Sequence, residues 1–347
     1  MKALLSRSPG GPETLELADV PEPTPGPGQI RIAVKAVGVN YPDVLIIEDK
    51  YQFKPERPFA PGAEISGVVD AVGEGVTGFA VGQRAIAMSG WGGMVGKICV
   101  DADRCAAMPD TMPFDEASAF LMTYGTSHHA LVHRAELRPG ETLLVLGAAG
   151  GVGLAAVEIG KAMGARVVAA ASSDEKLAVA KAHGADVLVN YGKAPTDKAE
   201  SRALADKFKA ACGENGADAI YDPVGGAYCE PALRAIAWKG RYLVVGFPSG
   251  IPAPPLNLTL LKGCDIRGVF WGAFTRKEPE LYQAELDELF KWHAEGKLKP
   301  EISARFPLER AGEAISLLAR PGAPGPRVVD VDRARLTPRG RPAERAT

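Results

Sequence analysis

The sequence lacks long apolar runs, and none approaches the roughly 18 residues that a membrane-spanning helix requires. The residues after Met1 do not form the apolar centre of a secretory signal peptide. No two of the five cysteines have the two-residue spacing of a zinc knuckle or a redox dithiol, and their number is odd. We therefore expect a cytoplasmic protein whose cysteines are reduced and mostly packed.

A strong charge of one sign is also absent. The 40 Lys and Arg residues nearly balance the 42 Asp and Glu residues, which gives a net charge of −2. Residues 332–347 carry five Arg against two acids, so the chain before them is net acidic, which argues against a nucleic-acid surface on the folded body. The segment 332–347, rich in Pro, Gly and Arg, is expected to be a disordered tail, with an RNA or membrane role as the weaker alternative.

A length of 347 residues favours two domains, and the content of 46% hydrophobic and 24% charged residues is typical of globular proteins. Up to about Cys105, glycines and prolines separate short strand-like runs. Within 29–39, Ile30, Ile32 and Val34 alternate with other residues at the period of two that a half-buried strand requires. This pattern predicts an antiparallel barrel or sandwich, with strands at 2–5, 29–39, 65–72, 83–87 and 94–100.

After about Thr123 the pattern changes to short apolar strands that alternate with amphipathic helices. Such an order predicts a parallel sheet covered by helices on both faces. The expected strands are 142–146, 166–171, 186–189, 218–221, 241–245 and 265–270. The expected helices between them are 151–163, 174–183, 199–211 and 228–237. Helices at 279–294 and 308–319 and a strand at 327–331 complete the chain.

The glycine-rich run Gly147–Gly153 lies between the first of these later strands and its helix. In the dinucleotide-binding fingerprint, the three glycine positions fall on Ala148, Gly150 and Gly153. Gly150 lets the backbone approach a pyrophosphate, and Gly153 permits close packing of helix on strand. N–H groups at the helix start supply an anion site, although such a run can also be a simple strand-to-helix turn. The candidate cofactor-binding residues here are Ala149, Gly150, Gly151, Val152 and Gly153.

The end of the second strand indicates which dinucleotide binds. An NAD enzyme places an acid there for the ribose hydroxyls, but the position near Ala171 holds none. Ser172, Ser173 and Lys176 follow, and they can hydrogen-bond and neutralise a 2′-phosphate that an acid would repel. This favours NADPH. In the alternative interpretation, one of the serines only caps a helix and Lys176 is solvated.

Six short motifs appear in order along the chain, and together they are specific. They are Gly-Val-Asn-Tyr-Pro-Asp at 38–43, Pro-Gly-Ala-Glu-Ile-Ser-Gly-Val-Val at 61–69, Val-Gly-Glu-Gly-Val at 72–76, the run at 147–153, Asp-Pro-Val-Gly-Gly at 222–226 and Val-Gly-Phe at 245–247. With them, the chain up to about Val331 resembles the zinc-independent, zeta-crystallin-like NADPH:quinone oxidoreductases of the medium-chain dehydrogenase/reductase superfamily.

The resemblance implies an α/β fold of two domains and a homodimer. A GroES-like β-barrel catalytic domain would comprise 1–122 and 268–331, and a Rossmann domain with a doubly wound parallel sheet would comprise 123–267 and bind NADPH. Zinc-dependent relatives carry a Cys at the position of Asn40 and a His at that of Ala63, so the tetrahedral zinc site cannot form there. His129 and His133 have helical spacing, but no third metal ligand is evident, and we expect no metal.

The missing zinc ligands restrict the chemistry. Alcohol oxidation needs a Lewis acid for the alkoxide, whereas reduction of a quinone or polarised C=C bond mainly needs two rings held in orientation. We therefore predict an NADPH-dependent, zinc-independent oxidoreductase that transfers hydride to a quinone or an α,β-unsaturated carbonyl. One alternative is an enoyl-CoA or enoyl-thioester reductase. From another class, the alternative is a non-catalytic NADPH-binding protein with a structural, sensory or RNA-binding role.

Three catalytic candidates match family residues near the nicotinamide. Asn40 could hydrogen-bond a carboxamide or a substrate carbonyl, and Tyr51 could stack or donate a proton. Thr126 aligns with a threonine beside the cofactor. Each has a structural alternative: a turn cap for Asn40, loop packing for Tyr51, and an N-cap of the helix that follows for Thr126.

The resemblance also indicates cofactor contacts outside the glycine-rich run. Tyr191 resembles a tyrosine that covers the adenosine phosphate, and Phe247 and Ser249 resemble contacts on the nicotinamide side. Phe247 could instead close a core. Arg327 could reach the 2′-phosphate or simply flank it. His128, at a position that is often tyrosine in the family, could donate a proton or be exposed.

Overall fold

The computed structural model describes residues 1–319 and 325–331, so the expected tail at 332–347 lies outside the described residues. The chain divides into two compact units. Unit 1 comprises Met1–Ala119 and the segments that begin at Ala304 and Arg327, and unit 2 comprises Phe120–Ser303 and the segment that ends at Pro326. Residues 268–303, expected in the catalytic domain, thus belong to unit 2.

Unit 1 is built on a mainly antiparallel sheet that the end of the chain completes with β14 and β15, which pair in parallel. Its strands are β1 (Lys2–Ser6), β2 (Leu15–Asp19), β3 (Gln29–Val39), β4 (Glu64–Val72), β5 (Arg84–Met88), β6 (Lys97–Asp101), β7 (Cys105–Ala107), β14 (Ala304–Pro307) and β15 (Arg327–Asp330). Its helices are α1 (Tyr41–Ile47), α2 (Phe114–Ala117) and α11 (Ala311–Ala319). The main sheet has the order β14-β15-β3-β4-β5-β7, and β1 pairs with β2.

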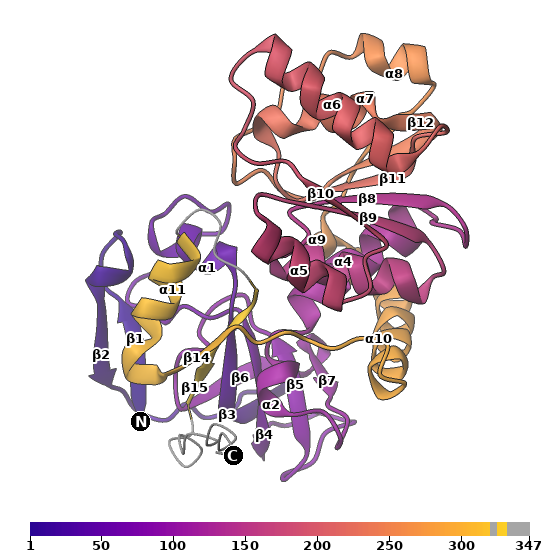
Figure 1. Ribbon diagram of the computed structural model, residues 1–347. Helices are drawn as coiled ribbons and strands as arrows, with labels where there is room; N and C mark the ends of the chain where they lie inside the picture. The colour runs from indigo at the N-terminus through magenta and orange to yellow at the C-terminus, as the bar shows by residue number, and fades with distance from the viewer. Residues whose placement is uncertain (320–324, 332–347) are drawn as a thin grey trace, which may run out of the picture. The chain divides into compact units, whose positions relative to one another are not determined.

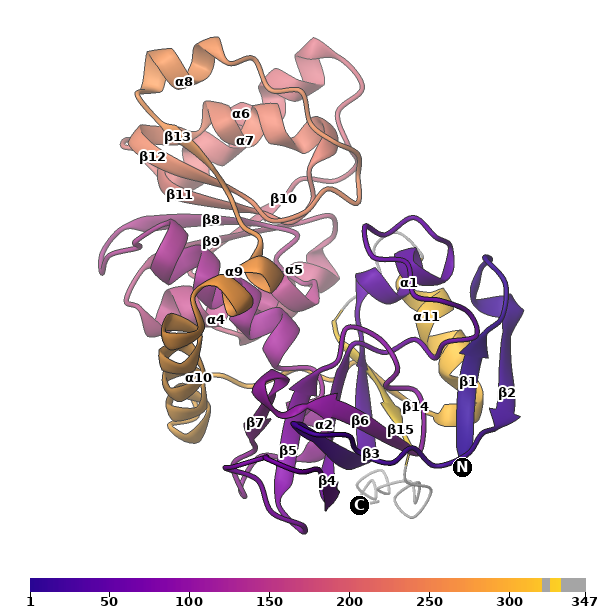
Figure 2. The same ribbon diagram turned by 180° about the vertical axis from the view of Figure 1, so that it is seen from behind.

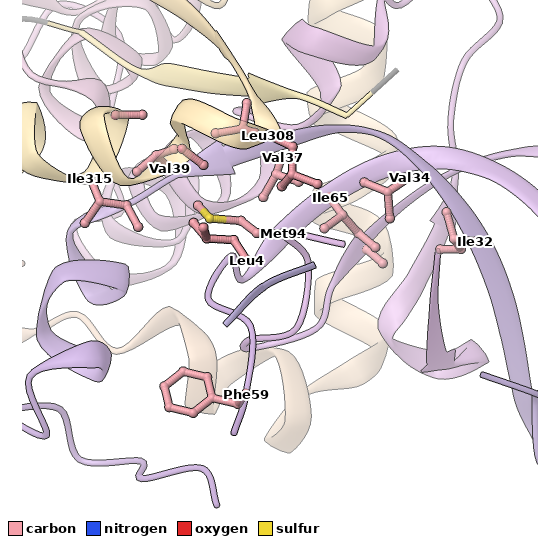
Figure 3. Packing of buried hydrophobic residues seen from close by; sticks show 14 of the residues in the cluster. Leu4, Ile32, Val34, Val37, Val39, Phe59, Ile65, Met94, Leu308 and Ile315 are labelled. Carbon is pink, nitrogen blue, oxygen red and sulfur yellow. The ribbon is translucent and has the colours of Figure 1, made fainter. Parts of the chain in front are cut away.

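The long strand β3 organises this unit. One of its edges pairs with β4, whereas the other pairs with β6 near its start and with β15 near its end. The side chains of Ile30, Ile32 and Val34 are buried, as their alternation predicted. They join a core to which β1, β4 and α11 also contribute, including Leu4, Ile65 and Ile315 (Figure 3). The antiparallel character predicted for this part of the chain is therefore confirmed.

Unit 2 contains a six-stranded parallel sheet in the order β10-β9-β8-β11-β12-β13. Its strands are β8 (Thr142–Leu146), β9 (Arg166–Ala171), β10 (Val187–Asn190), β11 (Ala217–Asp222), β12 (Ile236–Val244) and β13 (Asp265–Gly268). Its helices are α3 (Thr126–His128), α4 (Gly151–Ala162), α5 (Asp174–Ala182), α6 (Lys198–Cys212), α7 (Cys229–Arg234), α8 (Asn257–Lys262), α9 (Trp271–Lys277) and α10 (Pro279–Ala294). Figures 1 and 2 show α4 and α5 on one face of the sheet and α6 and α7 on the other.

This order is that of a doubly wound dinucleotide-binding sheet, in which the direction of winding reverses between β8 and β11. The helix expected at 228–237 is shorter: α7 ends at Arg234, and β12 begins at Ile236. Ile236 and Ala237, the last residues of the expected helix, belong to β12 instead, and Ile236 pairs with Ala217 of β11. Among the described residues, no helix has both the length and the apolar content to cross a membrane.

Candidate active site

The glycine-rich loop joins β8 to α4 at the point where the winding reverses. Gly147 has a φ of 58°, in the left-handed region that favours glycine, and the N–H of Gly150 donates to its carbonyl at 2.9 Å. A Cβ atom on Gly153 would lie 2.2 Å from the Gly147 carbonyl oxygen, so only glycine fits there. Gly150 precedes the first residue of α4, and the N–H groups of a first helical turn have no partner within the helix. The loop therefore has the shape of a phosphate cradle.

The turn after β9 brings together the three residues predicted for a 2′-phosphate. Ser173 is the N-cap of α5, and its side chain accepts from the backbone N–H of Lys176. The Nζ atom of Lys176 lies 2.8 Å from Ser172 Oγ. The capping and phosphate-binding interpretations are thus compatible, because Ser173 serves the helix while Ser172 and Lys176 form a polar, cationic pair. The nearby Asp174 accepts from Asn190 at 2.8 Å.

Tyr191 lies directly after β10, and its backbone N–H donates to Ala171 at the end of β9. Its ring lies 4.6 Å from that of Tyr228, centroid to centroid, and the Gly147 backbone acts to lower the pKa of its hydroxyl. Burial raises the pKa of Tyr191, so its phenol stays protonated at neutral pH. The structure therefore places Tyr191 beside the glycine-rich loop.

Phe247 and Ser249 lie in the loop after β12. A Cβ atom on Gly225 would lie 2.6 Å from Phe247 Cβ, and one on Gly226 would lie 2.4 Å from the Ser249 carbonyl oxygen, so the two loops pack backbone to backbone. Phe247 is 48% exposed, and the alternative in which it closes a core is wrong. Because the strand runs on into an open loop, the ring faces solvent rather than the sheet.

A buried carboxylate beneath these loops was missed at the sequence level. Asp222, 2% exposed at the end of β11, accepts from the N–H groups of Val224 and Gly225, both at 2.8 Å, and from the Tyr242 hydroxyl. Burial raises its pKa. The Asp-Pro-Val-Gly-Gly motif at 222–226 was the available signal. Its aspartate fixes the loop on which Phe247 and Ser249 rest.

Thr126 lies in unit 2 within a continuous helical stretch. Its φ and ψ angles are −57° and −44°, and π-helical turns at Leu121–Gly125 and His129–Arg134 flank it. The N-cap alternative for Thr126 is therefore wrong, because its backbone is helical rather than extended. Such π-helical turns occur frequently at functional sites.

In unit 1, Asn40 is the N-cap of α1. Its backbone N–H donates to Asp43 Oδ2 at 2.8 Å, and its Nδ2 donates to Glu64 Oε2 at 3.0 Å. Asp43 and Glu64 are buried, and burial raises the pKa of Asp43 to about 6. The three-residue spacing of Asn40 and Asp43 is a capping signal that could have indicated Asp43. Glu64 reaches Asn40 only through the pairing of β3 with β4, in which Gly38 faces Glu64.

The other two candidates in unit 1 differ in their surroundings. Tyr51 is half-buried, its ring lies 5.9 Å from that of Phe53, and burial raises its pKa. Arg327, on β15, is 5% exposed, and its Nη1 has no hydrogen-bond partner among the described residues. A buried guanidinium without an acceptor is costly, and an anion would stabilise it. Asn40, Tyr51 and Arg327 belong to unit 1, whereas Thr126 and the remaining candidates belong to unit 2.

His128 is buried, so the exposed alternative for it is wrong. Its Nδ1 lies 3.1 Å from Glu285 Oε2 and its Nε2 lies 2.8 Å from Glu288 Oε2, both on α10. Glu285 also lies near His133, so His128, His133 and Glu285 form a group that the sequence analysis did not predict; His129, the histidine expected to pair with His133, is not part of it. The sequence could not indicate this group, because Glu285 follows His128 by 157 residues.

The doubly wound sheet with its phosphate cradle, together with the separate antiparallel unit, defines a dinucleotide-dependent dehydrogenase or reductase of the medium-chain superfamily. Residues 26–111 match the model of the alcohol dehydrogenase GroES-like domain, and residues 151–291 match that of the zinc-binding dehydrogenases.

Individual relatives indicate the family within this superfamily. A quinone oxidoreductase-like protein 2 homolog of Nematostella vectensis is 38% identical over 88% of this chain and 82% of its own length. The quinone oxidoreductase of Thermus thermophilus, solved also as its complex with NADPH, is 33% identical with a TM-score of 0.81, over 95% of this chain and 100% of that one. The Escherichia coli quinone oxidoreductase complexed with NADPH is 26% identical with a TM-score of 0.86. The match covers 95% of this chain and 100% of that one. The chain belongs to the quinone oxidoreductase family of the medium-chain dehydrogenase/reductase superfamily.

Proposed function

We propose that this chain is an NADPH-dependent oxidoreductase that transfers hydride to a quinone or an α,β-unsaturated carbonyl without a catalytic zinc. The observation that carries the proposal lies just after β9. Lys176 Nζ lies 2.8 Å from Ser172 Oγ there, and the position near Ala171 holds no acid for the ribose hydroxyls. A cation and a hydroxyl there suit a 2′-phosphate, which an acid would repel. Unit 1 would serve as the catalytic domain and unit 2 as the NADPH-binding domain.

The glycine-rich loop Ala149–Gly153 would bind the pyrophosphate through backbone N–H groups at the start of α4. Gly150, whose own N–H donates to Gly147, would let the backbone approach the pyrophosphate closely. Gly153 supports this assignment, because its missing Cβ leaves α4 close against the loop. Ser172, Ser173 and Lys176 would hold the 2′-phosphate. Tyr191 would cover the adenosine phosphate, and the loop with Phe247 and Ser249 would contact the nicotinamide side. Arg327 would supply a second cation to the 2′-phosphate, a role that its unpaired Nη1 supports.

The bound nicotinamide supplies the hydride, and the chain's own residues orient the acceptor. Asn40 Nδ2 carries two hydrogens, and Glu64 accepts one, so the other could bind a carboxamide or substrate carbonyl. Tyr51 would hydrogen-bond the acceptor as a protonated phenol, and Thr126 would position the nicotinamide. Asn40 and Ala63 offer no imidazole or thiolate to a metal, so the donor set does not suit a catalytic zinc at these positions.

Steady-state kinetics test both halves of this proposal. Oxidation of NADPH and of NADH is followed with quinones, enones and enoyl-CoA thioesters as separate acceptor classes. We expect a higher kcat/KM with NADPH and turnover with quinones or enones. An equal or higher kcat/KM with NADH would overturn the cofactor half. Turnover confined to enoyl-CoA would replace the proposed acceptor with an enoyl thioester.

The edge of the unit 2 sheet supports a homodimer, which we also propose. Among the described residues, β13 pairs only with β12, so its outer edge offers free backbone groups to a second copy. Exposed apolar side chains accompany this part of the sheet: Trp238 on β12 is 67% exposed, and Leu260 and Leu261 on α8 are 81% and 66% exposed. Such a surface is typical of an interaction site.

A further inference from the structure

Three side chains of unit 2 come together, two from one helical stretch and one from a helix much later in the chain. His128 and His133 come from the helical stretch that follows Phe120, and Glu285 comes from α10. One nitrogen of each histidine and one oxygen of Glu285 all lie within 4.8 Å of one another. We call this group the His–Glu cluster. Its side chains are shielded to different degrees, with exposures of 2% for His128, 0% for Glu285 and 22% for His133.

The carboxylate of the cluster is held in a defined orientation. Trp271 Nε1 donates to Glu285 Oε1 at 2.7 Å, which leaves Oε2 directed at the histidines. That oxygen lies 3.1 Å from His128 Nδ1 and 3.9 Å from His133 Nδ1. In a tetrahedral zinc site with bonds of about 2.0 to 2.1 Å, neighbouring ligand atoms are about 3.3 Å apart. The two distances lie on either side of this value. His133 Nδ1 also lies 3.2 Å from His129 Nδ1, so an ion bound to His133 would replace that contact.

The charges of the cluster also suit a divalent cation. Both ring nitrogens of His128 face carboxylate oxygens, Nδ1 towards Glu285 and Nε2 towards Glu288 at 2.8 Å. With hydrogen on both nitrogens, His128 places one positive charge between two carboxylates. A divalent ion in place of the hydrogen on Nδ1 would balance them. Glu288 would then accept from Nε2–H, which is the usual outer partner of a metal-bound histidine.

We propose that the His–Glu cluster binds a divalent transition-metal ion, Zn²⁺ in the first instance, through His128 Nδ1, His133 Nδ1 and Glu285 Oε2. Imidazole and carboxylate are ligands that zinc accepts. The site would fasten α10 to the helical stretch that holds Thr126. Asn40 and Ala63 are not among its ligands, so the proposed reduction without a zinc at those two positions is unaffected. The partly exposed His133 and Glu288, whose side chain is 43% exposed, give access from solvent.

Zinc binding by the full chain tests this proposal. The protein is freed of metal with a chelator, and Zn²⁺ is added back and measured by equilibrium dialysis and calorimetry. We expect one Zn²⁺ per chain and a higher Tm with the ion than without it. Co²⁺ in the same site should give the visible absorption of tetrahedral coordination. Failure of the wild-type chain to bind Zn²⁺ stoichiometrically would overturn the proposal.

Two variants locate the bound ion. His133→Ala removes a ligand from a half-buried position and should abolish stoichiometric binding. Glu288→Gln alters only the outer partner and should weaken Zn²⁺ affinity by about 10- to 100-fold. His183→Ala is the matched control, because His183 also pairs with a buried glutamate, Glu158, outside the cluster. Unchanged affinity in both His133→Ala and Glu288→Gln, or an equal loss in His183→Ala, would contradict the assignment. If His133→Ala fails to fold, Glu288→Gln alone decides.

Discussion

At the scale of single residues, the proposed choice of NADPH over NADH depends on Lys176. Its Nζ lies beside Ser172, where the phosphate that distinguishes NADPH from NADH would bind. Lys176→Ala should lower kcat/KM for NADPH about 10-fold, because a charge-assisted hydrogen bond to the phosphate is lost. The value for NADH should barely change. Steady-state kinetics with both cofactors measure this difference.

The control for this prediction is Lys181→Ala on the same helix. Lys181 hydrogen-bonds the Ala185 carbonyl near the end of α5, away from its N-terminus. Its removal should leave the ratio of NADPH to NADH kcat/KM unchanged. A loss with Lys176→Ala that is equal for the two cofactors would show that Lys176 does not contact the 2′-phosphate.

At the scale of elements, the first turn of α1 holds the carboxyl group of Asp43 in a buried position that disfavours its ionised form. Burial raises the pKa of Asp43 to about 6 from an ordinary value of 3.8, although three backbone N–H groups favour its ionised form. The folded protein therefore binds this proton more tightly than the unfolded chain. The resulting stability is present in acid and is lost as the pH rises from about 4 to about 6, by about 3 kcal/mol.

Asp43→Asn cannot ionise, so it should remove this part of the pH dependence. We expect the free energy of unfolding of the wild type, minus that of Asp43→Asn, to fall over this interval in urea denaturation. Asp70→Asn is the matched control, because Asp70 pairs with Arg31 and its pKa is lowered instead. A difference that stays constant with pH would show that folding does not raise the pKa of Asp43.

Elements differ in how well the sequence predicts them. The ranges of β3, β8 and β9 agree with the prediction, because alternation or a continuous apolar run is a local signal. The short α8 and α9 and the strand β14 were not predicted. Each is too short to show a period, and β14 is defined by its pairing with β15 rather than by its own residues. The end of α7 was predicted too late, because sheet pairing takes Ile236 and Ala237 from the helix.

At the scale of the whole molecule, the proposed homodimer makes a prediction. The wild-type chain should have the mass of two copies in sedimentation or light-scattering experiments. Replacing Leu260 and Leu261 together by Asp places charges on the exposed apolar face of α8 and should give a monomer. Leu281→Asp, on α10 and 46% exposed, should leave the dimer intact. A wild-type monomer, or a double variant that stays dimeric, would contradict an interface at this edge.

The sequence alone determined the division into an antiparallel and a parallel part, the position of the glycine-rich loop, the missing acid after β9 and the missing zinc ligands at Asn40 and Ala63. These features depend on neighbouring residues, or on one residue type at one position. Only the tertiary structure decided that Asn40 donates to Glu64, that Asp43 is buried, and that Glu285 meets His128 and His133. Those groups are separated along the chain, and strand pairing and helix packing bring them together. Contacts of this kind have no local signature, so the sequence predicted the glycine-rich loop but not the His–Glu cluster.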